Sequence, residues 1–108
     1  MYCVVYSSDA RPGTTHEDVA RILEQAEAAN TRARITGALM FDGQRFCQLL
    51  KGDEAQVTRT MKRIKRDLRH SNLRILDASQ TLARRFPGWS MLEVGQEEFQ
   101  DVLEALTA

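Results

Sequence analysis

The chain has 108 residues, of which 15 are basic and 15 are acidic, so its formal net charge is zero. A chain of this length forms one domain with a sizeable core. A balanced charge creates no field that would attract a nucleic-acid backbone or an anionic membrane. Because no apolar run approaches the ~20 residues of a membrane span, we expect a cytoplasmic protein that binds neither nucleic acid nor membrane.

The N-terminal part of the sequence predicts a strand followed by a helix. Residues 2–6, "YCVVY", read as a short apolar strand that ends near the turn-forming stretch "DARPG". Thr14 and Glu17 have the spacing of a capping box ahead of a helix over residues 15–29. Asn30 continues the apolar stripe of this helix, which comprises Val19, Ile22, Leu23 and Ala26.

The middle of the sequence predicts a hairpin and a second helix. "RITGALMF" and "RFCQLLK" are strand-like runs on either side of Asp42-Gly43, a dipeptide typical of hairpin turns. Asp53 is the expected N-cap of an amphipathic helix whose apolar residues are Val57, Met61, Ile64 and Leu68. Beside them, the i, i+4, i+7 spacing predicts a polar stripe on the same helix, formed by Arg63, Asp67 and His70.

The last third predicts two further strands, "LRILDAS" and "WSMLEV", and a short C-terminal helix in "QEEFQDVLEALTA". The element order predicts an α+β fold, a ferredoxin-like split βαβ sheet with an added fifth strand and two helices on one face. The C-terminal helix or a second subunit would cover the opposite face, where we place Cys3, Val5, Ala38, Met40, Cys47 and Leu49. A homo-oligomer is therefore expected.

The two cysteines, Cys3 and Cys47, both fall in predicted strands. Free thiols in such positions behave as small hydrophobic side chains. We therefore expect neither a disulfide scaffold nor a metal site.

Several polar residues fall on the helix-covered face of this predicted sheet. Gln48 shares a strand face with Phe46 and Leu50, in the middle of a run that a core would fill with aliphatic side chains. Tyr6 and Asn30 face the same space. Buried polar groups cost free energy unless they are hydrogen-bonded, so this set implies internal partners or a ligand with matching donors and acceptors.

Each of these residues also has an interpretation without a ligand. The stripe of Arg63, Asp67 and His70 could be a solvated helix face, and Asn30 could be a helix C-cap. Tyr6 could be a core aromatic with its hydroxyl at an edge. The residues alone predict no more than a polar pocket of heterocycle size between two helices.

The order and spacing of five segments resemble the BLUF family, the blue-light sensors that use FAD, over about residues 1–92. The segments are Tyr6 in "VVYSS", Asn30 with the following "ITG", "RFCQLLKG" with Gln48, "RIKRDLRHSN", and "RRFPGWSM". The resemblance implies a photosensor domain over residues 1–92. Residues 93–108 would complete it as a strand end and a C-terminal helix.

The resemblance also implies a non-covalently bound FAD whose ring lies between the two helices. Asn30 and Gln48 would hydrogen-bond the ring, and Ile22 and Phe46 would pack on it. Three further contacts would come from Arg63, Asp67 and His70. Ala29 is a departure, since many family members carry a second asparagine there, and we expect one flavin contact fewer.

The mechanism implied by the resemblance is light-driven electron and proton transfer from Tyr6, followed by rearrangement of the Gln48 amide by rotation or tautomerisation. Trp89 and Met91 complete the photochemical set and share one face of the fifth strand. An exchange between them beside Gln48 would carry the signal outward. We expect a sensor rather than an enzyme, with its output passed to a separate protein partner or through self-association.

Two other classes share this size and element order. A small acylphosphatase-like hydrolase needs a basic loop that holds a phosphate, and "DARPG" supplies one arginine without a glycine-rich cradle. A light-independent ferredoxin-like binding module, such as an RNA-binding one, would show stacking aromatics on the open face and a basic charge balance. Here the open face is aliphatic and the net charge is zero.

Overall fold

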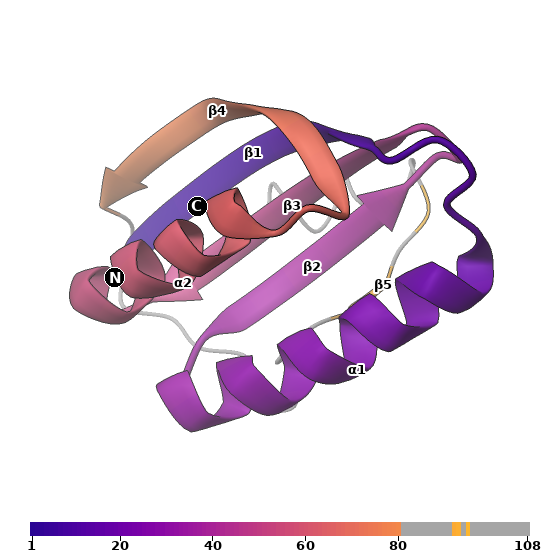
Figure 1. The fold of residues 1–108 in the computed structure, drawn as a ribbon. Helices are drawn as coiled ribbons and strands as arrows, with labels where there is room; N and C mark the ends of the chain where they lie inside the picture. Colours follow the sequence, from indigo (N-terminus) through magenta and orange to yellow (C-terminus); the bar gives the residue numbers. More distant parts are fainter. Residues whose placement is uncertain (81–91, 94, 96–108) are drawn as a thin grey trace.

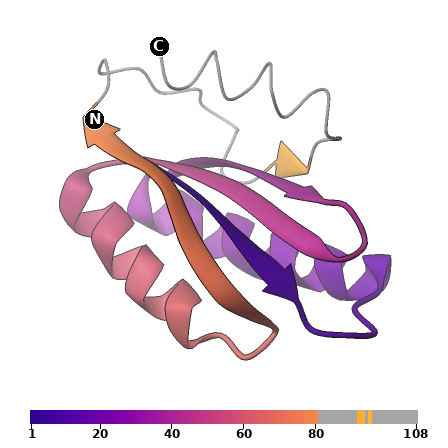
Figure 2. The ribbon, with the colours of Figure 1, turned by 90° about the horizontal axis from the view of Figure 1, so that it is seen from above.

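The structure is a computed structural model that describes residues 1–80, 92, 93 and 95 (Figure 1). Five strands form one sheet in the order β4-β1-β3-β2-β5, and both helices lie on the same face of it (Figure 2). The elements are β1 (Tyr2–Ala10), α1 (His16–Ala33), β2 (Thr36–Phe41), β3 (Arg45–Gly52), α2 (Glu54–Arg66), β4 (His70–Gln80) and β5 (Leu92–Glu93). The first four strands pair with one another antiparallel, so the predicted ferredoxin-like α+β fold is confirmed.

The predicted hairpin at Asp42-Gly43 is confirmed between β2 and β3. The Asp42 carboxylate accepts hydrogen bonds from the backbone N–H groups of Gln44 (2.9 Å) and Arg45 (2.7 Å). Gly43 has φ of +97°, which glycine adopts without steric cost. The local sequence therefore fixes this turn.

Helix α1 differs from the prediction at both ends. Its capping box is formed by Thr15 and Asp18, one residue later than the predicted pair. It continues to Ala33, and Arg34 ends it in the left-handed region with φ of 56°. Asn30 is therefore not a C-cap but a buried residue within the last turns.

Helix α2 starts after Asp53, as predicted, although the Asp53 side chain makes no capping hydrogen bond. It ends at Arg66, and Asp67 has an extended backbone. The prediction of one helical stripe was thus wrong for Asp67 and His70, because His70 is the first residue of β4. The Asp67 carboxylate instead accepts from the backbone N–H of Arg69 (2.9 Å), a local bond that competes with helix continuation.

The core on the helix-covered face consists of two clusters. Residues of β1, β3 and α2 form one together with Ile35, which lies between α1 and β2; this cluster comprises Val4, Tyr6, Ile35, Leu50, Val57 and Met61. Under α1 lies the smaller one, which comprises Val19, Leu39 and Phe46. Each helix is thus held against the sheet by its own apolar cluster.

On the opposite face, Cys3, Val5, Ala38 and Leu49 are buried, and Met40 and Cys47 are half-buried. Of the predicted fifth strand only Leu92–Glu93 is described, and it pairs parallel to β2. The predicted C-terminal helix lies outside the described residues. Neither described helix has the length and apolar character needed to traverse a lipid bilayer.

Candidate functional site

A cavity of about 290 Å³ opens between α1 and α2 above β1, β2 and β3. We call it the inter-helix cavity. It is lined by all eight predicted site residues that the structure describes, namely Tyr6, Ile22, Asn30, Phe46, Gln48, Arg63, Asp67 and His70. Trp89 and Met91 lie outside the described residues. These eight residues come from β1, α1, β3, α2, β4 and the segment between α2 and β4.

Tyr6 and Gln48 form the floor of the cavity on neighbouring strands. They are direct partners in the register of β1 and β3, and the Tyr6 hydroxyl donates a hydrogen bond to Oε1 of Gln48. Only 3% of Tyr6 and 6% of Gln48 is exposed. Burial is the main cause of the raised pKa of Tyr6, so the phenol keeps its proton and remains a hydrogen-bond donor at neutral pH.

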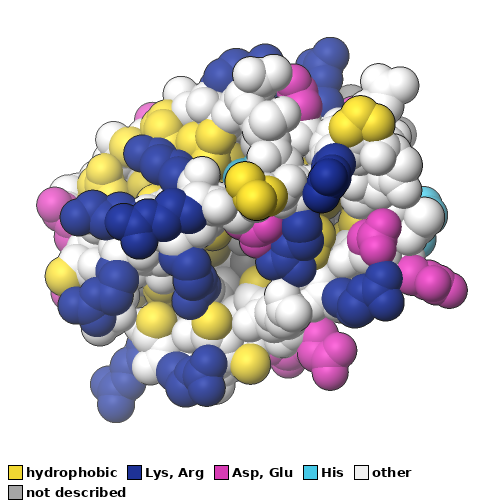
Figure 3. Space-filling view, viewed as in Figure 1, with side chains coloured by type: hydrophobic (Ala, Val, Ile, Leu, Met, Phe, Trp, Pro, Cys, Tyr) yellow, Lys and Arg dark blue, Asp and Glu magenta, His cyan; other side chains and the backbone are white. Residues whose placement is uncertain are grey.

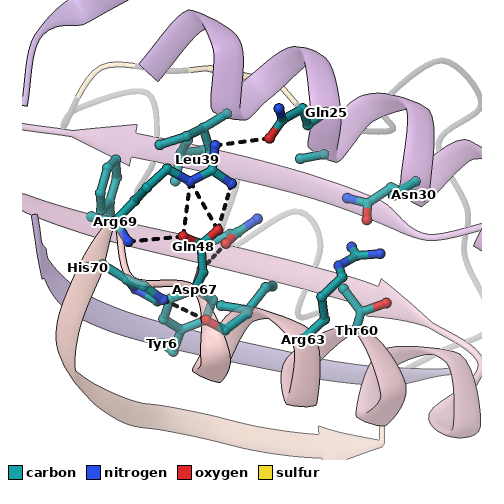
Figure 4. Close-up of a pocket in the computed structure, with 15 residues that line it drawn as sticks. Tyr6, Gln25, Asn30, Leu39, Gln48, Thr60, Arg63, Asp67, Arg69 and His70 are labelled. Carbon is teal, nitrogen blue, oxygen red and sulfur yellow. Dashed lines mark hydrogen bonds and ion pairs between the residues drawn. The ribbon is translucent and has the colours of Figure 1, made fainter. Parts of the chain in front are cut away.

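Two amides lie at separate positions around the cavity. Gln48 stands on the central strand β3, with Leu39 of β2 as its partner on the side away from Tyr6. Asn30 is 1% exposed and lies toward the end of the cavity that also holds Thr60 and Arg63 (Figure 4). A planar ligand that extends along the cavity would therefore meet an amide at its middle and another at one end.

The other end of the cavity carries a charged cluster. Asp67 and Arg69 form an ion pair with 2.6 Å between Oδ2 and Nη2, and Arg69 also donates to Oε1 of Gln25 on α1 at 2.9 Å. The guanidinium of Arg69 is the main cause of the lowered pKa of Asp67, through hydrogen bonds to that carboxylate. The cluster thus joins the segment after α2 to the middle of α1 (Figure 4).

His70 connects α2 to β1 beside Tyr6. Its Nε2 lies 2.6 Å from the carbonyl oxygen of Ile64 and its Nδ1 lies 2.7 Å from the hydroxyl of Ser8. A carbonyl only accepts, so Nε2 carries a proton, and in the neutral ring Nδ1 accepts from Ser8. The ring is tilted 58° to that of Tyr6 at a centroid distance of 6.3 Å, so His70 forms the wall next to the phenol.

The walls and polar groups of the cavity fit a flavin ring. Apolar side chains of Ile22, Leu39 and Phe46 supply surfaces on which a flat ring packs. The amides of Asn30 and Gln48 offer both donors and acceptors, as the polar edge of an isoalloxazine requires. The apolar walls can pack against the apolar part of a heterocycle, and the amides can hydrogen-bond its polar end.

Sequence reasoning missed several lining residues, of which Arg69 and Gln25 have the clearest chemistry. Arg69 lies in the short connection between α2 and β4, where no periodicity marks a site. Gln25 is exposed on α1 and off the apolar stripe. Ala26, Leu39, Thr60 and Ile64 also line the cavity without having been predicted as site residues, and Ala29 lines it at the position where many family members carry an asparagine. Arg69 falls within the run "RIKRDLRHSN", in which the spacing predicts only Arg63, Asp67 and His70 as site residues.

Comparison with known proteins points to one family. The profile of the BLUF family, described as sensors of blue-light using FAD, matches residues 1–92. The blue light- and temperature-regulated antirepressor BluF of Escherichia coli K12 is 32% identical over 105 residues, which cover 95% of this chain and 26% of that protein. The beta subunit of the photoactivated adenylate cyclase of Euglena gracilis is 27% identical, over 95% of this chain and 13% of that protein. The chain thus spans a minor part of both relatives.

Solved structures show the same fold. The dark-state structure of the BLUF protein BlrB superposes with a TM-score of 0.82 at 29% identity, over 98% of this chain and 80% of that one. A bacterial light-regulated adenylyl cyclase superposes with a TM-score of 0.82 at 28% identity, over 98% of this chain and 34% of that one.

Proposed function

This chain belongs to the BLUF family of blue-light sensors that bind a flavin, and we propose that it binds FAD non-covalently in the inter-helix cavity. Asn30 and Gln48 hold the ring by hydrogen bonds, and Ile22 and Phe46 pack against its faces. Arg63, Asp67 and His70 contribute further contacts. The observation that carries this proposal is the buried Tyr6–Gln48 hydrogen bond at the floor of a cavity lined by all these residues.

Bound flavin supplies a strong oxidant when it absorbs blue light. Tyr6 is then the donor of one electron and of the proton that it shares with Gln48. The phenol is suited to this role because it is buried, neutral and already hydrogen-bonded to the amide. Gln48 has chemically different ends, so rotation or tautomerisation of its amide changes which hydrogen bonds it offers to the ring.

The signal leaves the cavity through the sheet. Leu39, which pairs with Gln48, also pairs with Glu93 of β5. We assign the exchange beside Gln48 to Trp89 and Met91, which precede β5 in the sequence. Relatives include an antirepressor and adenylyl cyclases, and this supports an output by contact with a separate protein or a second copy of the chain. The chain itself then acts as a sensor and not as an enzyme.

The identity of the cofactor and its response to light test this function. Purified protein is denatured and the released cofactor is chromatographed against FAD, FMN and riboflavin. Native protein is then illuminated with blue light, and we expect a red-shifted absorption band that returns in the dark. A colourless protein that takes up no added flavin would overturn the proposal.

A further inference from the structure

The outer strand β4 exposes both a backbone edge and apolar side chains. It ends the described sheet next to β1, and none of its 11 residues is buried. Three large hydrophobic side chains are exposed in the described part of the chain, and two of them belong to β4, namely Ile75 at 46% and Leu76 at 59%. Every second residue of an edge strand points its N–H and C=O groups away from the sheet, so such an edge can pair with another strand.

A β-bulge in β4 places two opposite charges on one face of the sheet. Asp77 pairs with Val5 of β1, and Arg74 pairs with Ser7. Val5 and Ser7 are two positions apart, so they point to the same face. Arg74 and Asp77 are three positions apart, and Leu76 is the extra residue that the bulge inserts between them. The cation and the anion of β4 therefore lie on the same face.

Both charges have hydrogen-bonding capacity to spare. Among the described residues Asp77 forms no ion pair, and its carboxylate accepts from the Ser79 hydroxyl at 3.1 Å. Arg74 donates from Nη2 to Asp9 at 3.3 Å and from Nε to Ser7 at 3.4 Å, which are long distances for a guanidinium. Its Nη1 makes no hydrogen bond within residues 1–80, and its side chain is 52% exposed. The edge thus presents an accessible cation and an accessible anion.

The order of residues along β4 is complementary to itself when a second copy runs antiparallel. If a twofold axis passes between Ile75 and Leu76, Arg74 of each copy lies opposite Asp77 of the other. The symmetry repeats this contact, so the interface contains two ion pairs with the apolar residues between them. Opposite charges that face each other across neighbouring strands stabilise antiparallel pairing.

The helix-bearing face is a poorer surface for self-association. Basic side chains gather over α2 (Figure 3), and the exposed ones are Arg59, Lys62, Arg63, Lys65 and Arg66. None of them forms an ion pair with a described residue, so two such faces brought together would repel each other. Helix α2 lies on the inner side of β4, away from its free edge (Figure 1). Pairing along β4 therefore avoids this repulsion.

We propose that two copies of this chain associate by antiparallel pairing of their β4 strands, which joins their two sheets into one. Ile75 and Leu76 meet at the twofold axis, and an Arg74–Asp77 ion pair lies on either side of it. The contact is small, so the dimer should form reversibly and depend on concentration. The pairing uses no residue that binds flavin, and it is therefore independent of the proposed function.

The oligomeric state of the full chain tests this inference. Size-exclusion chromatography with light scattering is run in the dark over a concentration series, at about 0.15 M salt, where charges more than about 8 Å apart are screened. We expect the average mass to rise from monomer towards dimer, with a Kd below about 1 mM. Hydrogen exchange over residues 70–80 should slow as the concentration rises, because the outward N–H groups of β4 become hydrogen-bonded in the dimer.

Two charge-reversal variants test the register. Asp77→Arg puts a cation opposite Arg74, and Arg74→Glu puts an anion opposite Asp77, so each variant should raise its own dimer Kd about tenfold. An equal mixture of the two should restore dimerisation, because both ion pairs of the mixed dimer then join opposite charges. The matched control is the pair Lys62→Glu and Glu24→Arg, at exposed helix positions, which should associate as the wild type does.

A wild-type chain that stays monomeric at about 1 mM would overturn this inference. A dimer whose Kd neither single variant changes would do the same, as would a mixture that stays monomeric or exchange that slows only outside residues 70–80. Restoration in the mixture also shows that both variants are folded. If either variant fails to fold, Leu76→Lys replaces an exposed side chain and should weaken the dimer by placing like charges at the axis, and an unchanged Kd there would overturn the inference.

Discussion

The hydroxyl of Tyr6 donates a hydrogen bond to the side-chain oxygen of Gln48, across two central strands that pair these residues directly. The two residues are 42 positions apart in the sequence. Both strands are flanked on each side by another strand, so the backbones on which the two side chains stand are firmly held. Any rearrangement at this pair is therefore confined to the side chains.

Replacement of Tyr6 by Phe should abolish the reversible red shift and keep flavin bound. Phenylalanine preserves the buried ring and removes the transferable proton and the donor to Gln48. The loss of one buried hydrogen bond should lower the free energy of unfolding by about 1–3 kcal/mol. The measurement is a light-minus-dark absorption spectrum with a matched unfolding curve. A full reversible shift in the variant would contradict the role of the phenol as donor.

Replacement of Gln48 by Leu should have the same spectral outcome for a different reason. Leucine keeps most of the volume on β3 and removes the amide that lies between the phenol and the cavity. Flavin should still bind through the remaining lining residues, with its dark-state absorption shifted because one hydrogen-bonding group is gone. Leu39→Val is a useful control, since it changes packing beside Gln48 and should keep the light response. If the leucine variant responded to light as the wild type does, the amide would not be the switch.

The Asp67–Arg69 ion pair should make stability depend on acid pH. Arg69 holds the pKa of Asp67 below its ordinary value, which is about 3.9. A lowered folded-state pKa contributes stability that is present above the ordinary value and is lost as the pH falls through the folded-state value. Asp67→Asn should therefore lower Tm at pH 7, and the difference in Tm from the wild type should shrink as the pH falls below the ordinary carboxyl pKa. The effect is modest because both side chains are partly exposed.

The difference in Tm between wild type and Asp67→Asn is measured by thermal unfolding between about pH 3 and pH 7, a range that includes the ordinary carboxyl pKa. Glu24→Gln is the control, since Glu24 is an exposed carboxylate on α1 that does not line the inter-helix cavity. If the difference in Tm between wild type and Asp67→Asn stayed constant over this whole pH range, the pH dependence of stability would not come from this ion pair.

The cysteines should be passive in the light response. Cys3 is fully buried and burial raises its pKa to about 11, and the pKa of Cys47 is raised for the same reason. Neither lines the inter-helix cavity. Alanine at both positions should keep the reversible red shift and cost about 1 kcal/mol of stability per site. Loss of the spectral response would show that a thiol communicates with the flavin.

Met91→Ala should separate detection from output. The variant should keep the flavin red shift, and it should weaken any light-dependent change in self-association or in hydrogen exchange near the C-terminus. Size-exclusion chromatography with light scattering, and hydrogen exchange, are compared in dark and light for both proteins. Identical mass and exchange of the wild type in the two states would rule out this output route and direct attention to a partner at the flavin-side loops.

Sequence periodicity located the cavity because alternation along β1 and β3 determines which side chains face the helices. Tyr6, Phe46 and Gln48 line the inter-helix cavity, as the period of two requires. Asn30 was placed correctly by the helical stripe of α1, although it lies inside the helix and not at its end. These positions depend on local geometry, which a sequence pattern records.

The end of α2 could not be predicted in the same way, because it depends on bonds made by side chains to distant or non-periodic partners. The Ile64 carbonyl accepts from the N–H of Asp67 and lies 2.6 Å from Nε2 of His70. These bonds replace the next helical turn, and they exist only once His70 has joined β4 beside β1. Arg69 acquires its role from the same connection, so its place in the cavity became visible only in the structure.

The sheet order has a consequence for how such a sensor can diversify. Leu39 of β2 pairs with Gln48 of β3 on one side and with Glu93 of β5 on the other. Strand β5 is an edge strand of the described sheet. Neighbouring strands lie about 4.8 Å apart, so the edge is about two strand spacings, or 10 Å, from the strand that holds the glutamine. Neither described residue of β5 lines the cavity. Substitutions on that edge can therefore change which partner protein binds while the light-detecting strands β1 and β3 stay unchanged. Light detection and partner specificity can thus evolve independently.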